Sequence, residues 1–135
     1  MIKNVGNGWS KFNLGSFKGH PSYITSVPID ILEAFIDYHK KGCGCAFFDE
    51  EGNDFTLVIN PYSLLIIEEK EEIKVYDLSD LNIKELEKEL INDIESDIDN
   101  WMYWEPCCKF NDNSEKYLKE LRDKLNELKK YGKHL

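Results

Sequence analysis

The spacing of apolar and polar residues predicts one short strand and then a helix at the start of the chain. Apolar and polar residues alternate over residues 11–17, which is typical of a strand. Pro28 stands where helices favour proline, and apolar residues recur after it at intervals of three and four. Gly42, preceded by two lysines, is a typical helix end. We therefore predict a helix over residues 28–41.

Four runs rich in β-forming residues follow, and they predict an antiparallel meander. The runs lie at residues 43–48, 55–60, 63–68 and 73–78. The loop between the first two runs reads DEEGND, and its glycine can adopt the positive φ of a hairpin turn. The loops hold most of the acidic residues in this part of the chain. The simplest interpretation of these acids is solubility and protection of strand edges.

Two amphipathic helices are predicted after the meander. The first covers residues 83–103, with Ser79, Asp80 or Asn82 as its N-terminal cap. The second starts at Asp112, which has Glu115 three residues later in a capping-box pattern. Its apolar stripe is Leu118, Leu121, Leu125 and Leu128. We predict a single α+β domain over residues 1–135: an N-terminal strand and helix, a four-stranded antiparallel meander, and two C-terminal helices packed on the sheet.

Composition narrows the class of protein. A chain of 135 residues with 13% aromatic residues can bury one substantial core and is not disordered. No apolar run approaches the roughly 18 residues that a membrane span needs, and the first residues contain no apolar signal segment. We expect a cytoplasmic protein with no membrane partner. The bias of lysine over arginine suggests a bacterial or phage gene.

Charge is distributed unevenly along the chain. The net charge is −9, and residues 43–79 and 80–105 each hold nine acidic and two basic residues. Such a negative middle repels nucleic acid and attracts cationic partners. We therefore expect a basic protein partner and no nucleic acid.

Within this acidic middle, carboxylates recur every four residues along the predicted helix 83–103. Like charges four residues apart are neighbours on a helix and repel each other. A solvated helix face explains the pattern most simply, a docking face for a basic partner is the sharper hypothesis, and mimicry of nucleic acid is a third. Tryptophans at the end of the row are typical interface anchors. The predicted partner-binding residues are Glu85, Glu89, Asp93, Asp97, Trp101 and Trp104.

No recognised motif predicts catalysis, a cofactor or a metal. The cysteines form Cys43-Gly44-Cys45 and an adjacent pair, Cys107 and Cys108, which is poor spacing for zinc. We expect Cys43 and Cys45 to pack as small buried groups. The three histidines have no companion pattern and are interpreted as scattered surface or loop residues. An enzyme is the less favoured hypothesis, and we expect no cofactor and no metal.

In size, acidity and element order the chain resembles small bacterial immunity proteins, which neutralise partner toxins; no motif carries this likeness. The leading hypothesis is a protein-binding module, most concretely an immunity protein or inhibitor that docks on a basic toxin or nuclease. One alternative is a small enzyme or ligand-binding protein with a pocket between the sheet and the first helix, near His20, Tyr23 and Cys45. Another is a structural subunit that self-associates through the leucine stripe of the last helix.

Overall fold

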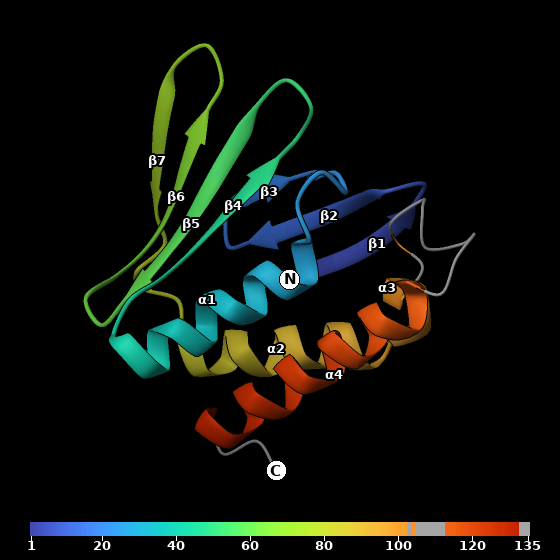
Figure 1. The fold of residues 1–135 in the computed structure, drawn as a ribbon. Helices are drawn as coiled ribbons and strands as arrows, with labels where there is room; N and C mark the ends of the chain where they lie inside the picture. The colour runs from blue at the N-terminus through green and yellow to red at the C-terminus, as the bar shows by residue number, and fades with distance from the viewer. Residues whose placement is uncertain (103, 105–112, 133–135) are drawn as a thin grey trace.

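The computed structural model describes residues 1–102, 104 and 113–132, and it has the predicted α+β class (Figure 1). Seven strands form two sheets, with four helices in the described part of the chain. In chain order the elements are β1 (Ile2–Gly6), β2 (Trp9–Leu14), β3 (Phe17–Gly19), α1 (Val27–Lys41), β4 (Gly44–Asp49), β5 (Asp54–Asn60), β6 (Ser63–Glu69), β7 (Ile73–Asp77), α2 (Ile83–Glu95), α3 (Ile98–Met102) and α4 (Asn113–Gly132).

The N-terminus forms a three-stranded sheet, where the sequence predicted one strand. Strands β1, β2 and β3 pair in that order, all antiparallel. The turn between β1 and β2 contains Asn7 and Gly8, both with positive φ. Two-residue hairpin turns favour Asn-Gly for this reason, since their twist matches that of the strands. The prediction missed β1 because its apolar content is low, although its turn signal is present.

The second sheet is the predicted four-stranded meander, in the order β4-β5-β6-β7. Alternate residues of β4, β5 and β6 face inward and are buried, whereas β7 has no buried residue. Phe48 and Phe55 on this inner face pack against Phe12 and Phe17 of the N-terminal sheet, with ring centroids 4.8 Å apart for Phe17 and Phe55. Close packing of the two sheets explains why Gly19 carries no side chain, because a Cβ there would lie 2.7 Å from the ring of Phe55.

Helix α1 lies between the four-stranded sheet and the helices α2 and α4 (Figure 1). Its buried residues fill the space under the inner face of the sheet. Gly44 at the start of β4 touches the backbone of α1 directly, because a Cβ there would lie 1.8 Å from the Ala34 carbonyl oxygen. None of the described helices combines the length and the apolar character that a membrane span requires.

The single helix predicted over residues 83–103 is two helices, α2 and α3, with Ser96 and Asp97 between them. Of the three predicted caps, Asn82 is the one that caps α2, and its side chain accepts a hydrogen bond from the Glu85 amide at 3.1 Å. At the break, the Asp97 carbonyl oxygen accepts a hydrogen bond from the Trp101 backbone amide, and the Asp97 carboxylate accepts one from the Asn100 side-chain amide at 2.6 Å. Short polar side chains that bond locally favour such breaks over helix interiors, and the apolar spacing alone does not reveal this.

Candidate protein-binding site

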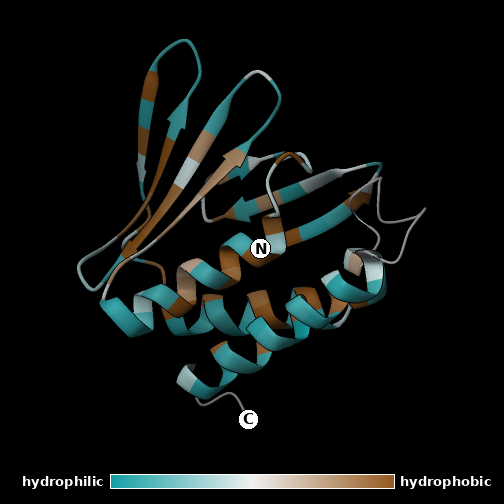
Figure 2. Cartoon of the chain, in the orientation of Figure 1, coloured by the Kyte–Doolittle hydropathy of each residue, from teal (hydrophilic) through white to brown (hydrophobic). Residues whose placement is uncertain are grey.

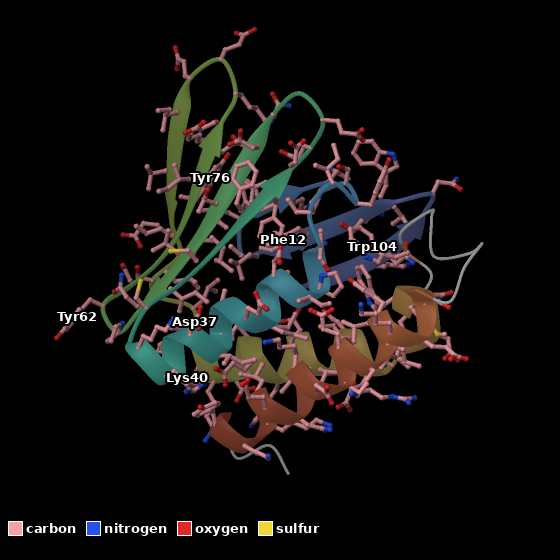
Figure 3. The ribbon with its side chains drawn as sticks, in the orientation of Figure 1. Phe12, Asp37, Lys40, Tyr62, Tyr76 and Trp104 are labelled. Carbon is pink, nitrogen blue, oxygen red and sulfur yellow. The ribbon has the colours of Figure 1, made fainter. Side chains whose placement is uncertain are left out.

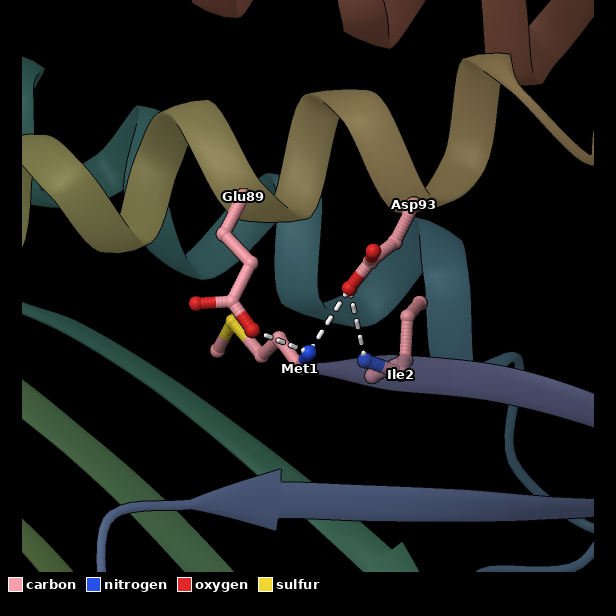
Figure 4. Close-up of polar contacts among 4 residues, drawn as sticks. All are labelled: Met1, Ile2, Glu89 and Asp93. Atoms are coloured by element: carbon pink, nitrogen blue, oxygen red, sulfur yellow. Dashed lines mark hydrogen bonds and ion pairs between the residues drawn. The ribbon is translucent and has the colours of Figure 1, made fainter.

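The centre of the predicted acidic row binds the chain's own N-terminus (Figure 4). The Met1 ammonium donates to Glu89 Oε1 at 2.6 Å and to Asp93 Oδ2 at 2.7 Å, and the Ile2 amide also donates to Asp93 at 3.1 Å. Burial lowers the pKa of this amine, but the hydrogen bonds and charges of Asp93 and Glu89 outweigh burial and raise the pKa above its usual value. These two carboxylates therefore hold β1 against α2.

The ends of the row also have local partners. Glu85 is exposed and lies 3.6 Å from the Lys88 ammonium, one turn along α2. Asp97 accepts the side-chain amide of Asn100 and lies at the break between α2 and α3. The four carboxylates thus do not form one free acidic face, because each has a partner within the chain.

The two tryptophans predicted as anchors lie in the core. Trp101 is fully buried and Trp104 is 2% exposed, with their ring centroids 5.6 Å apart. The Trp104 indole N–H donates to the Tyr117 hydroxyl on α4 at 3.0 Å (Figure 3 labels Trp104). Both tryptophans pack in the core against α4. Neither is therefore presented to a partner in this structure.

The place predicted for the alternative pocket, between α1 and the sheet, is occupied by apolar side chains of the described residues. The space between α1 and the sheet is filled by apolar side chains of both elements, all at most 5% exposed. Cys45 lies on the opposite, outward face of β4, whereas His20 and Tyr23 lie in the segment between β3 and α1. The leucine stripe of α4 is likewise used internally, since Leu121, Leu125 and Leu128 are buried in the monomer and Leu118 is half-buried.

The expectation that Cys43 and Cys45 are buried was wrong, because both are exposed. In the register of the sheet, Gly44 and Ala46 occupy the inward positions of β4, which turns Cys45 outward, and Cys43 lies just before the strand. Cys107 and Cys108 lie outside the described residues. Within the described ranges, no three His, Cys, Asp or Glu side chains gather in an arrangement that could hold a metal ion.

The outward face of the four-stranded sheet is the feature that the predictions missed. Two rows of side chains cross this face: Cys45, Val58, Leu65 and Asp77 in one, and Phe47, Thr56, Ile67 and Val75 in the other. Phe47 is 48% exposed and Val75 is 56% exposed. No described segment covers this face, which is unusual for a sheet that is apolar on both sides.

A row of acids ends this apolar face. Asp49, Asp54 and Glu69 lie opposite one another in the next outward row, followed by Ile73 on β7. No described residue forms an ion pair with any of these three carboxylates, although like charges on facing strands repel. The hairpin loops beyond them add Glu50, Glu51, Glu71 and Glu72. The site is therefore an apolar surface with an unneutralised acidic border.

The sequence does contain a signal for this face. Half-covered antiparallel strands alternate apolar and polar residues, whereas β5 contains Leu57-Val58-Ile59 and β6 contains Leu64 to Ile67 without interruption. Figure 2 shows these hydrophobic segments in brown along the two central strands. Tyr62, 93% exposed, extends into solvent from the turn that joins them (Figure 3). No protein-family model, curated protein or solved structure matches the chain.

Proposed function

We propose that the protein is a protein-binding module, most concretely an immunity protein or inhibitor, that binds a basic protein through the outward face of β4–β7. The observation that carries this proposal is the uncovered apolar face bordered by Asp49, Asp54 and Glu69. An apolar centre with a polar rim is the usual anatomy of a protein interface. In the proposal, Phe47 and Val75 supply buried area and the acids select the partner.

The charge of the chain supports a cationic partner. The net charge is −9, and among the described residues no cation pairs with Asp49, Asp54 or Glu69, since Lys70 in the adjacent loop pairs with Glu68. Complementary charge mainly raises the association rate and excludes wrong partners, while the apolar centre supplies more of the affinity. A basic toxin or nuclease domain is the partner class that fits both features.

The test compares proteins captured from the native host by three forms of the full chain. The first is the wild type, and the second is Phe47→Thr/Val75→Thr, which keeps strand-forming residues but removes the apolar centre. The third, Glu85→Gln/Asp99→Asn, removes exposed carboxylates on α2 and α3 as a control for net charge. We expect the wild type and the control to retain one basic protein that the face variant loses.

The captured protein is then produced with and without this chain in the same cells. Relief of its toxicity by the wild type, but not by Phe47→Thr/Val75→Thr, supports an inhibitor. Identical captured proteins for all three forms would overturn the docking face. A basic partner whose activity and toxicity this chain leaves unchanged would refute inhibition and leave only the binding role.

A further inference from the structure

The outer edge of the four-stranded sheet has backbone groups that point away from the sheet. The Leu78 amide donates to the Leu64 carbonyl at 2.8 Å, and the Lys70 amide donates to the Glu72 carbonyl at 3.2 Å. Residues in an antiparallel ladder alternate between those that bond the neighbouring strand and those that point outward. Counting along β7 from both bonds gives the same result: the amides and carbonyls of Ile73, Val75 and Asp77 point away from β6.

This edge is open and weakly protected. In Figure 1, β7 is the last strand of its sheet, and no described segment runs beside it. Proteins usually block such edges with proline, a bulge or outward-pointing lysines. β7 has a regular register and no proline, and its one lysine, Lys74, turns its ammonium over the Tyr76 ring at 4.7 Å.

The same residues that expose backbone groups also expose apolar side chains. Ile73 is 69% exposed and Val75 is 56% exposed, and both lie on the outward face beside the apolar rows. A strand added next to β7 would bond to their backbone and widen the apolar face by one strand. Because Asp77 and the acidic loop at Glu71 lie at the two ends of β7, basic side chains on the added strand would meet acids at both ends.

We propose, resting on the proposed function, that β7 takes up an extended segment of the basic partner as a fifth antiparallel strand. The segment has apolar side chains facing Val75 and Ile73 and basic side chains at its ends, near Asp77 and Glu71. A second copy of this chain fits the edge less well. Two chains of net charge −9 would meet, and antiparallel pairing centred on Val75 would place each Asp77 opposite an apolar Ile73.

The probe is the acetylated and amidated peptide RTVTITR, titrated into the full chain while the amide signals are followed by NMR. When the peptide pairs antiparallel with β7, alternate side chains lie on the outward face. In order, these are arginine, valine, isoleucine and arginine. One control peptide is N-methylated at valine and isoleucine, which removes two donors to β7, and another has glutamate in place of arginine. We expect saturable shifts at β7 for RTVTITR and binding weaker by about tenfold or more for each control.

The protein variant Val75→Pro tests the same contact from the other side. The Val75 amide points outward, so proline removes an edge donor without removing a bond to β6. Val75→Ala is the matched control that trims the side chain and keeps the donor. We expect Val75→Pro to weaken peptide binding about tenfold more than Val75→Ala. If Val75→Pro fails to fold, the N-methylated peptide on the wild type decides.

Equal binding of the N-methylated peptide, or shifts outside β7, would overturn strand addition. Concentration-dependent β7 shifts of the protein alone would also overturn it, since the occupant would then be a second copy. If the captured basic partner binds Val75→Pro as tightly as the wild type, strand addition fails and the proposed function stands. If the peptide binds at β7 but no basic partner is captured from the host, strand addition stands and the proposed function fails.

Discussion

Replacing Asp30 by Asn should stabilise the protein at neutral pH. Asp30 lies half-buried in the first turns of α1. Burial, followed by the charges of Glu33 and Glu120, raises its pKa from 3.8 to about 6. Glu33 is itself engaged with Lys124 of α4 at 3.4 Å. The ionised form of Asp30 is therefore disfavoured in the folded protein.

The size of the expected stabilisation follows from the difference between the folded and unfolded pKa of Asp30. A difference of about two pKa units corresponds to a ceiling of about 3 kcal/mol. Water reaches part of this half-exposed carboxylate, so screening reduces the cost to about 1.5 kcal/mol. A first-turn carboxylate also favours the helix dipole by about 0.5 kcal/mol, which Asn lacks. Asp30→Asn should therefore increase the free energy of unfolding by about 1 kcal/mol at pH 7.

The pH dependence gives the sharper test. The folded pKa lies above the unfolded one, so the folded state binds the proton more tightly and the wild type loses stability as pH rises from about 4 to 6. Urea unfolding at pH 4 and pH 7 should show a gain for Asp30→Asn that is small at pH 4 and full at pH 7. Asp37→Asn, on the exposed side of α1, is the control. A gain equal at both pH values, or no gain at pH 7, would refute the reasoning.

Three further predictions concern contacts that join distant parts of the fold. Asp93→Asn should lower the free energy of unfolding by about 1–2 kcal/mol at pH 7. Because the Met1 amine has a raised pKa, this loss should shrink as pH rises from about 8 through that pKa, measured by urea unfolding. Tyr117→Phe should cost about 1–3 kcal/mol in the same assay, since it leaves the buried Trp104 indole N–H without its acceptor. Gly44→Ala should cost about 3 kcal/mol or more in thermal unfolding, because its Cβ would meet the backbone of α1.

The two side-chain predictions, Asp93→Asn and Tyr117→Phe, each have a control in the chain. Asp99→Asn removes an exposed carboxylate and should leave stability within about 0.5 kcal/mol. Tyr62→Phe removes a hydroxyl that is fully in solvent and should also be neutral. A loss for Asp93→Asn that is unchanged at high pH would contradict the role of the Met1 ammonium. Normal thermal stability of Gly44→Ala would contradict the close approach of β4 to α1.

Local sequence patterns predicted the elements of this fold far better than their breaks. The four meander strands and α1 lie within one or two residues of their predicted positions, since apolar periodicity and Gly and Pro signals agree there. Asn7-Gly8 is a recognisable turn signal, but the low apolar content of β1 prevented the prediction of that strand. The break at Asp97 depends on local polar bonds, which periodicity does not register.

The site was harder to predict because charge and aromatic type do not determine exposure. Glu89 and Asp93 have no lysine three or four residues away in the sequence, but their cation is the Met1 ammonium, about ninety residues away. His39, interpreted as a scattered surface histidine, lies against the buried Glu87 of α2 and stacks on Tyr131 of α4. Contacts between residues so distant in sequence follow from the packing of helices and cannot be read from spacing.

The two acidic rows of the molecule can now be distinguished by what neutralises them. Three carboxylates of the row on α2, Glu85, Glu89 and Asp93, have internal cations, so their charge contributes to folding and needs no partner. The row at Asp49, Asp54 and Glu69 has none among the described residues, and its carboxylates face one another across neighbouring strands at a cost to stability. These repelling carboxylates lie beside an uncovered apolar face and an open strand edge. A basic partner bound there would neutralise the carboxylates and cover the apolar face. The tract at β4–β7, rather than the helix, is therefore where mutations should separate binding from folding.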